Sequence, residues 1–305
     1  MVATKRKIAV VGSGAVGGYY GSLLSRAGQD VHFLLRSDYE LVRKRGFRIA
    51  SSEESFVLYP VQSYRRAEDI GPCDLVIVAV KATANSVLPD VLRWLVGPET
   101  VLMTLQNGIG NAELLAEHFG AERVVGGLCF VCINRTGPGE IQNYLPGRID
   151  LADFSGELRE RTREIAAMMS EAGVWCVPSP SLEEALWRKL CWNVPFNGLT
   201  ILGGAISTDA VLASPSLTRL ARLLMVEIQS AARAHGFTIE DSFLDHQFEI
   251  TGRMGAYKPS SLVDYVKGRE IEVEAIWGEA LRRGTKAGVP MPHLETVYLL
   301  LKREF

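Results

Sequence analysis

The stretch Lys7–Leu35, KIAVVGSGAVGGYYGSLLSRAGQDVHFLL, decides the fold of the first half of the chain. Its first five residues are an apolar run that suits a strand buried on both faces. The glycine pattern GSGAVG follows at 12–17, then an amphipathic segment at 19–27 and a second apolar run at 31–35. A strand, this glycine pattern, a helix and a second strand within about thirty residues form the unit that binds a dinucleotide.

Each glycine of the pattern has its own backbone role. Gly12 permits a tight turn, Gly14 lets the backbone approach a pyrophosphate, and Gly17 allows the helix to pack closely on the strand. The amides at the start of the helix would bind the phosphates. The alternative is a glycine-rich turn without a ligand. In this context we predict a cofactor-binding turn made of Gly12, Ser13, Gly14, Ala15, Val16 and Gly17.

The residue after the second strand indicates which dinucleotide is bound. A site for NAD usually has Asp or Glu there, to accept a hydrogen bond from the ribose 2′-hydroxyl. Here the strand ends at Leu35 and is followed by Arg36 and Ser37. A guanidinium cannot accept from a hydroxyl, but it can bind a 2′-phosphate. The sequence therefore predicts NADPH/NADP+, unless Arg36 merely begins a solvated helix.

Two further strands place polar residues where ligands bind in open α/β sheets, at the carboxyl ends of the strands. The run 74–80 is apolar and is followed by Lys81. The run 101–105 leads into Gln106-Asn107-Gly108. We expect Lys81 and Asn107 to face the cofactor or the substrate. The plainer alternatives are a surface lysine and an ordinary Asn-Gly turn.

Composition excludes several classes of protein. The chain has 305 residues, 47% of them apolar and 22% charged, with a net charge of −2, so no polycationic surface for nucleic acid is expected. The sequence has no uninterrupted apolar run of about 18 residues, so we expect no membrane span. The five cysteines do not suggest a disulfide framework and fit a reducing cytoplasm. Cys129 and Cys132 form a lone CxxC inside a strand, and we expect buried thiols.

The sequence Pro178-Ser179-Pro180-Ser181 marks the best domain boundary. Strand-like segments stop there, and the remaining segments have helical periodicity and end at glycines. The predicted fold class is α/β, with an N-terminal Rossmann-type doubly wound sheet at 1–178 and a C-terminal all-helical domain at 179–305. The expected helices are 183–202, 216–234, 241–253, 261–267, 273–286 and 293–302.

The first of these helices contains EALWRKLCWNVPFNGLTILGG, residues 184–204, and is apolar on nearly every side. Such a helix belongs inside a protein. Lys189, Asn193 and Asn197 nevertheless lie four residues apart and therefore share one face. Buried polar groups need partners, so this face predicts a polar ligand or a partner elsewhere in the chain. A solvated stripe is the alternative, and Pro195 should kink the helix.

Two later segments carry candidate residues for an anionic substrate. Ser260 and Ser261 precede a helix, where either is by default an N-cap. The same helix terminus would suit a carboxylate. Glu272 lies between Ile271 and Val273, which could draw it inward, although a surface acid is the more common reading of this segment.

With these residues in place, the chain resembles the 2-dehydropantoate 2-reductases, also called ketopantoate reductases. The resemblance runs from Lys7 to about Pro292. It is carried by GSGAVG, Arg36, VKA at 80–82, QNGIG at 106–110, KLCWNVPFN at 189–197, PSSLVD at 259–264 and IEVEAIWG at 271–278.

The resemblance implies roles for these residues. Lys189 would be the catalytic acid, and Glu272 would support Lys189 and the ligands, with Glu274 as the alternative acid. Asn193, Asn197, Ser260 and Asn107 would bind the substrate. Asn107 and Glu272 would also contact the cofactor. Trp277 stands where the family usually has Asn, and Leu128-Cys129 where small polar residues are usual, which leaves the identity of the 2-keto acid open.

The expected function is NADPH-dependent reduction of a 2-keto acid to a 2-hydroxy acid, with 2-dehydropantoate and pantoate, in coenzyme A biosynthesis, as the first choice. Another branched 2-keto acid is the alternative. A 3-hydroxyacid dehydrogenase usually has its Lys and Asn three residues apart, unlike Lys189 and Asn193. A non-catalytic NADP(H)-responsive regulator would not need the polar face. A homodimer through helices 216–234 and 273–302 is possible, and so is a monomer.

Overall fold

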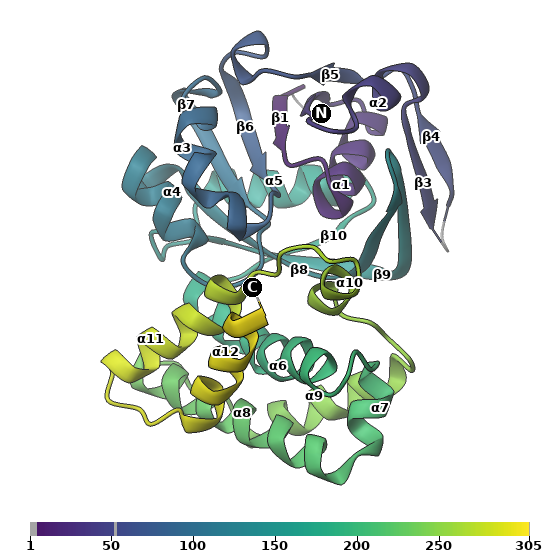
Figure 1. Ribbon diagram of the computed structural model, residues 1–305. Helices are drawn as coiled ribbons and strands as arrows, with labels where there is room; N and C mark the ends of the chain where they lie inside the picture. Colours follow the sequence, from purple (N-terminus) through teal and green to yellow (C-terminus); the bar gives the residue numbers. More distant parts are fainter. Residues whose placement is uncertain (1–4, 52–53, 305) are drawn as a thin grey trace. The chain divides into compact units, whose positions relative to one another are not determined.

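The computed structural model describes residues 5–51 and 54–304, which form two compact units (Figure 1). The sheet unit comprises Met1–Gln106 and Asn111–Leu182, and the helical unit comprises Asn107–Gly110 and Glu183–Phe305. The short segment Asn107–Gly110 therefore belongs to the helical unit, although the sequence around it belongs to the sheet unit. The sequence predicts a domain boundary after residue 178, and this stays a prediction. The boundary between the two compact units lies four residues later, after Leu182.

The sheet unit is built on a ten-stranded sheet in the order β4-β3-β9-β8-β7-β6-β1-β2-β5, with β10 paired to β9. The strands are β1 (Lys7–Val11), β2 (Asp30–Leu34), β3 (Phe47–Ser51), β4 (Phe56–Leu58), β5 (Gln62–Tyr64), β6 (Cys73–Val78), β7 (Val96–Thr104), β8 (Val124–Gly137), β9 (Glu140–Asp153) and β10 (Trp175–Pro178). The helices are α1 (Ala15–Arg26), α2 (Tyr39–Arg45), α3 (Leu88–Leu92), α4 (Asn111–Phe119) and α5 (Glu160–Glu171). Short 3₁₀ turns lie at η1 (Ala67–Asp69), η2 (Ala82–Val87) and η3 (Ala121–Arg123).

Six of the strands have the topology of a dinucleotide-binding sheet. The strands β5, β2, β1, β6, β7 and β8 are neighbours in that order, and every pair among them is parallel. This is the order 3-2-1-4-5-6, in which the connections reverse direction beside β1, and ligands bind at that reversal. The predicted Rossmann-type α/β fold is confirmed.

The remaining strands extend the sheet beyond β8. The long strand β9 is antiparallel to β8 and carries β3 and β10 along its other edge, both parallel to it. The sequence did not predict the pairing of β9 with β3, which lies about ninety residues earlier in the chain. In this extension, α1 packs against β8, β9 and β3.

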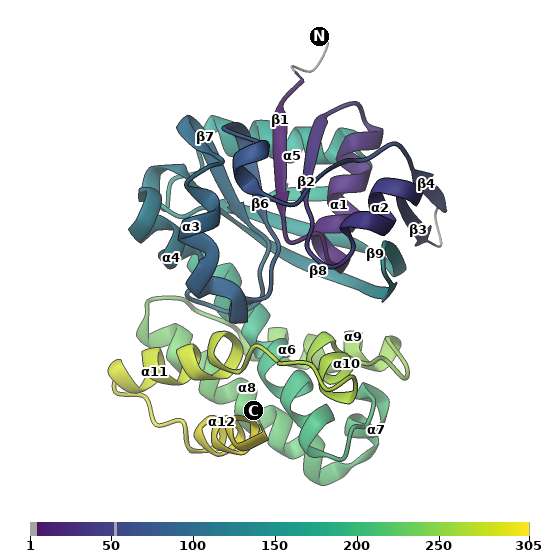
Figure 2. The same cartoon turned by 45° about the horizontal axis from the view of Figure 1, so that its top comes forward.

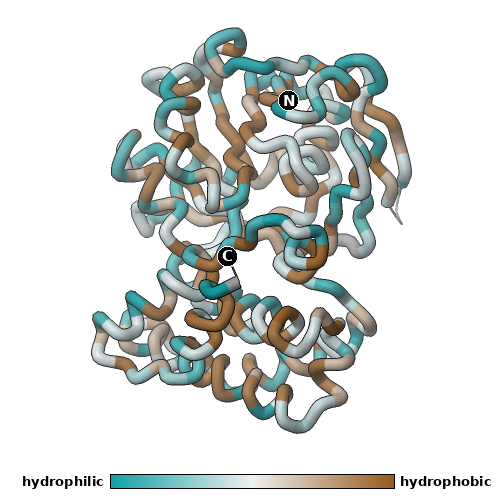
Figure 3. The backbone as a smooth tube through the Cα atoms, in the orientation of Figure 1, coloured by the Kyte–Doolittle hydropathy of each residue, from teal (hydrophilic) through white to brown (hydrophobic). Residues whose placement is uncertain are grey.

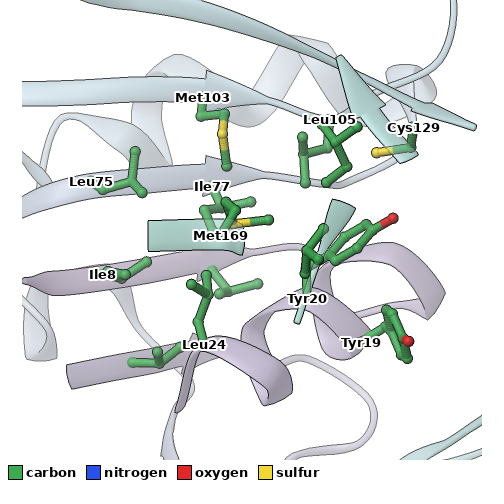
Figure 4. Packing of buried hydrophobic residues seen from close by; sticks show 14 of the residues in the cluster. Ile8, Tyr19, Tyr20, Leu24, Leu75, Ile77, Met103, Leu105, Cys129 and Met169 are labelled. Atoms are coloured by element: carbon green, nitrogen blue, oxygen red, sulfur yellow. The ribbon is translucent and has the colours of Figure 1, made fainter. Parts of the chain in front are cut away.

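Apolar side chains from strands and helices fill the core of the sheet unit. Figure 4 shows Ile8, Leu75, Ile77 and Met103 from neighbouring strands packing with Leu24 of α1 and Met169 of α5. These strands are hydrophobic along most of their length, as Figure 3 shows by colour, because both of their faces are covered.

The helical unit has no strand among its described residues. Its helices are α6 (Leu182–Leu202), α7 (Thr208–Ala213), α8 (Pro215–Ala234), α9 (Asp241–Arg253), α10 (Ser260–Val266), α11 (Glu279–Lys286) and α12 (Pro292–Glu304), with a single π-helical turn, η4 (Glu274–Gly278), before α11. Helix α6 runs through the middle of this unit in both Figure 1 and Figure 2, with α8 and α9 beside it. The predicted all-helical second half is confirmed.

Pro195 does not interrupt α6, which is helical on both sides of it. The proline removes one backbone donor. Close packing surrounds the site: the indole Nε1 of Trp277 donates to the carbonyl oxygen of Val194 over 2.9 Å. Gly198 makes room for this contact, because a Cβ there would lie 3.2 Å from the same Nε1 atom. Trp277, the residue that departs from the family's usual Asn, is fully buried and locks η4 onto α6.

Candidate active site

The turn between β1 and α1 requires glycine at two positions. Gly12 has φ of +96°, and a Cβ on it would lie 2.3 Å from the backbone nitrogen of Val80. A Cβ on Gly17 would lie 2.2 Å from the carbonyl oxygen of Gly12 and 3.0 Å from the side chain of Val10. Gly12 therefore makes the turn, and Gly17 lets α1 approach β1, which are the backbone roles expected from the sequence.

Gly14 differs from its two neighbouring glycines. It caps α1 at φ of −77°, and a Cβ added to it would meet no heavy atom within 4 Å. Open space therefore lies beside the first turn of α1, whose amides have no side-chain cap. Unfilled space next to uncapped amides at a helix N-terminus fits the pyrophosphate of a dinucleotide. Ser13 is bound within the protein, since its hydroxyl donates to the carbonyl oxygen of Leu34 over 3.3 Å.

The end of β2 presents one exposed cation. Arg36 is exposed and has no hydrogen-bond or ion-pair partner among the described residues. The Ser37 hydroxyl donates to Oδ1 of Asp38 over 2.9 Å. Lys81 lies three residues after the end of β6, half-buried at the start of η2. These positions are at the carboxyl ends of the parallel strands, the edge where ligands bind in such sheets.

The polar face of α6 is buried. Lys189, Asn193 and Asn197 are 8%, 8% and 2% exposed, so they are not a solvated stripe. The ammonium Nζ of Lys189 donates to Oδ1 of Asn107 over 3.0 Å. A buried ammonium without a partner would be very costly, and the Asn107 carboxamide supplies one hydrogen bond to it.

The segment Asn107–Gly110 is shaped to hold Asn107 beside Lys189. The backbone amide of Ile109 donates to the carbonyl oxygen of Ala275 over 2.9 Å. Gly108 has φ of +87°, and a Cβ on it would lie 2.2 Å from the same Ala275 oxygen. The Asn-Gly pair is therefore more than a permissive turn, because its glycine allows the segment to lie against η4.

Asn197 joins α6 to α10. Its Nδ2 donates to the carbonyl oxygen of Asn193 over 3.1 Å, and its Oδ1 accepts from the backbone amide of Ser261 over 3.2 Å. Ser261 is buried, whereas Ser260 is exposed. Neither serine is the N-cap expected from the sequence, because Pro259 occupies that position and makes no side-chain capping bond. The start of α10 is instead docked on α6 through the Asn197 carboxamide.

The structure separates the two candidate acids. Glu272 is 9% exposed and lies just before η4. The side chain of Glu274 is 53% exposed and binds surface partners: Arg282 at 2.7 Å, the Tyr298 hydroxyl at 2.8 Å and Lys302 at 3.2 Å. Glu274 therefore belongs to a surface network, and Glu272 remains the candidate for the site.

Sequence reasoning missed a chain of hydrogen-bonded polar side chains in the sheet unit, in which Thr104, Gln106 and Asn111 are buried and Asn85 is half-buried. Gln106 Nε2 donates to Oδ1 of Asn85 over 2.8 Å, and Asn85 Nδ2 donates to Oδ1 of Asn111 over 2.9 Å. Thr104 Oγ1 donates to Oε1 of Gln106 over 3.1 Å. Gln106 and Asn111 flank the segment that carries Asn107, so Asn85 ties its two ends together. The signal in the sequence was three amide residues: Gln106 begins QNGIG, Asn111 follows it directly, and Asn85 lies four residues after Lys81.

Other site chemistries find no support in the described part of the chain. No group of three or more His, Cys, Asp or Glu side chains there could hold a metal ion. Helices long and apolar enough to cross a membrane are likewise absent from it. The expectation of buried thiols is confirmed, since all five cysteines are buried. Burial raises the pKa of Cys73 to about 11 and that of both Cys176 and Cys191 to about 12, so these three thiols are protonated at neutral pH.

Comparison with known families decides the relationship. The family model "Ketopantoate reductase PanE/ApbA" matches residues 8–156, and the model of its C-terminal part matches residues 181–304. The chain belongs to the ketopantoate reductase family. Members of this family named 2-dehydropantoate 2-reductase act on a CH–OH group, so this chain is an oxidoreductase of that class.

Individual relatives agree over nearly the full length. A 2-dehydropantoate 2-reductase of Nostoc sp. is 37% identical, over 98% of this chain and 95% of its own. The crystal structure of the enzyme of that name from Geobacter metallireducens is 44% identical, with a TM-score of 0.96 over 98% of this chain and 99% of its own. The one from Methylococcus capsulatus is 34% identical, with a TM-score of 0.89 over 97% and 95%.

Proposed function

We propose that this protein reduces 2-dehydropantoate to pantoate with NADPH. The observation that carries the proposal is the buried ammonium of Lys189, held by Asn107 on a face that also bears Asn193. A globular core gains nothing from burying a lysine, because desolvation of its charge is unfavourable. The buried ammonium would stabilise the negative charge that develops on the carbonyl oxygen of a substrate during reduction.

The proposed cofactor fits the residues of the sheet unit. Open space beside Gly14 and the uncapped amides of α1 would accommodate the pyrophosphate. The exposed guanidinium of Arg36, at the end of β2, would bind the ribose 2′-phosphate. Lys81 would lie beside the bound dinucleotide. This set of residues favours NADPH over NADH, because the residue that follows the second strand is a cation instead of a carboxylate.

In the proposed reaction, the bound nicotinamide supplies the hydride that the keto carbon of the substrate accepts. Lys189 donates a hydrogen bond and then a proton to the keto oxygen, and general acid assistance of this kind contributes about 10²–10⁴-fold. Burial favours the neutral amine, so a carboxylate is needed to keep Lys189 protonated, and we assign that role to Glu272. Glu272 would also contact the cofactor.

Four residues would orient the substrate. The Asn193 and Asn107 carboxamides would bind its oxygen atoms near Lys189. Asn197 holds α10 in place and has one Nδ2 hydrogen left for the substrate in addition to its bond to Asn193. Ser260, exposed at the start of α10, would bind the carboxylate together with the amides of that helix terminus.

The test is oxidation of NADPH, followed by absorbance, with 2-dehydropantoate beside simpler branched 2-keto acids and a 3-hydroxyacid run in the reverse direction. We expect 2-dehydropantoate to give the highest kcat/KM. A higher value for another 2-keto acid would replace the substrate, and turnover of the 3-hydroxyacid alone would replace the reaction class. NADPH binding without turnover on any of them would favour a regulator. The homodimer remains a prediction, to be measured by sedimentation.

A further inference from the structure

Asp38 is a carboxylate at the end of the second strand that the protein has already engaged. It lies two residues after Arg36 and precedes α2, yet it does not cap that helix with its side chain. Its side chain is 7% exposed. Oδ1 accepts from the Ser37 hydroxyl over 2.9 Å and from Arg135, and Oδ2 accepts from the Gly139 amide over 3.0 Å. Three donors therefore bind the carboxylate, and two of them, Arg135 and the Gly139 amide, hold it against the β8–β9 hairpin.

An acid in this part of the chain normally decides the choice of dinucleotide. In sites for NAD, an Asp or Glu after the second strand accepts from the ribose 2′-hydroxyl. The same negative charge repels a 2′-phosphate, which carries about −1.5 to −2 charges at neutral pH. Asp38 has the right chemistry for NAD, but its oxygens are turned to Arg135 and Gly139, and its charge is balanced by a guanidinium.

We propose that Arg135 is a specificity-determining residue, which makes the enzyme prefer a 2′-phosphorylated dinucleotide by holding and neutralising Asp38. Arg135 lies on β8, about a hundred residues from Arg36, and acts through Asp38 without contacting the cofactor. Arg36 is thereby left as the uncompensated charge at the end of β2. This inference rests on the proposed function, in which Arg36 binds the 2′-phosphate.

Two groups in the Asp38 environment have separate effects on its carboxylate. The Gly139 amide fixes one oxygen to the hairpin, and Arg135 supplies the opposite charge. If Arg135 is replaced by an uncharged residue, the Asp38 carboxylate loses its guanidinium partner and a donor on Oδ1. Its carboxylate can then turn to a ribose 2′-hydroxyl and repel a phosphate bound at Arg36. The consequence is a change in the ratio of NADPH to NADH affinity, which a merely structural ion pair would not alter.

The experiment measures the Kd of NADPH and of NADH by titration calorimetry for the full-length wild type and for Arg36→Ala, Arg135→Met, Arg135→Lys, Asp38→Asn and the double variant Arg135→Met with Asp38→Asn. We expect Arg135→Met to raise the Kd of NADPH by at least about tenfold, through the uncompensated charge, and to leave that of NADH unchanged or lower. Arg135→Lys keeps the charge and should restore most of the preference. The double variant should prefer NADPH again, because it has no charge at position 38.

The outcomes separate this inference from the proposed function. If Arg36→Ala keeps the wild-type ratio, the assignment of Arg36 to the 2′-phosphate fails, whatever Arg135 does. If Arg36→Ala loses the preference but Arg135→Met keeps it, the inference on Arg135 is wrong and the proposed function stands. A double variant that loses the preference as fully as Arg135→Met would overturn the indirect role. Should Arg135→Met not fold, the double variant and Arg135→Lys still decide, and NADH binding reports on folding in each.

Discussion

The turn at 12–17 and the polar face of α6 are the two candidate ligand sites, and they are built differently. The turn uses the backbone: two glycines permit its shape, and a third leaves open space beside it. The polar face uses side chains, namely Lys189, Asn193 and Asn197 of α6, and the Asn107 side chain from a distant segment binds Lys189. A backbone site can be lost through one added methyl group, whereas a side-chain site is lost through one missing functional group.

The largest expected effect is on the side-chain site. Lys189→Ala removes the proposed proton donor, so kcat/KM for the keto acid should fall by about 10²–10⁴-fold in steady-state assays. NADPH binding, measured by fluorescence titration, should remain close to that of the wild type. Arg188→Ala on the same helix is the control, because Arg188 pairs with Glu184 and donates to the Thr238 carbonyl. Near wild-type turnover of Lys189→Ala would remove this residue from the chemistry.

The next effect concerns the backbone site, and two glycines two residues apart make a matched pair. Gly12→Ala adds a Cβ at 2.3 Å from the Val80 nitrogen at a positive φ, so we expect the free energy of unfolding to fall by about 2–4 kcal/mol. Gly14→Ala adds a Cβ into open space and should leave stability within about 0.5 kcal/mol.

Gly14→Ala should nevertheless weaken NADPH binding, because the open space is where the pyrophosphate would approach the backbone. Thermal unfolding and NADPH titration of both variants measure the two effects. Wild-type NADPH affinity in a stable Gly14→Ala variant would contradict the location of the cofactor. A Gly12→Ala variant as stable as the wild type would contradict the backbone account of the turn.

The same contrast explains what could be predicted from the sequence. The turn is contiguous, and the roles of Gly12 and Gly17 follow from neighbours that the strand–turn–helix order fixes. The α6 face was also visible, because the spacing of Lys189, Asn193 and Asn197 is a property of one helix. The six-strand parallel core follows from the alternation of strands and helices.

Contacts between distant segments could not be predicted. The hydrogen bond from Lys189 to Asn107 connects positions 82 residues apart. No pattern in QNGIG indicates that Asn107–Gly110 belongs to the helical unit. The capping role expected for Ser260 or Ser261 was wrong, since docking of α10 on Asn197 uses a backbone amide that no sequence pattern encodes. The pairing of β9 with β3 was missed for the same reason: it depends on where a long hairpin lies in three dimensions.

A smaller effect is expected at Asn85, which binds the residues on both sides of the segment Asn107–Gly110. Asn85→Ala removes the two hydrogen bonds that link the buried amide side chains of Gln106 and Asn111. Stability should fall by about 1–3 kcal/mol in denaturant titrations. If Asn85 also positions Asn107, kcat/KM should fall while the Kd of NADPH stays near that of the wild type. Ser86→Ala, at an exposed neighbouring position, is the control. A stable and fully active Asn85→Ala variant would show that the segment holds its shape without this link.

The smallest effect contrasts Glu272 with Glu274 and depends on pH. Burial raises the pKa of Glu274, but hydrogen bonds from Arg282, Tyr298 and Lys302 outweigh it and hold the pKa below its ordinary value of 4.5. A carboxyl with a lowered folded-state pKa stabilises the protein above its unfolded-state pKa, and the stabilisation is lost as pH falls through the folded-state pKa. Because this network is more than half exposed, Glu274→Gln should cost less than about 1 kcal/mol at pH 7 and less still at high salt.

The difference between Glu274→Gln and wild type should therefore disappear as pH is lowered below about 4.5, and activity at pH 7 should be unchanged, because Glu274 serves the surface of the helical unit. Glu295→Gln on α12 is the control, since it removes the same charge at an exposed position. Glu272→Gln should behave in the opposite way, with lower kcat/KM at pH 7. Urea titrations across pH 3–7 and steady-state rates distinguish the two acids. Loss of turnover in Glu274→Gln with normal turnover in Glu272→Gln would exchange their roles and place the proposed partner of Lys189 on η4 itself.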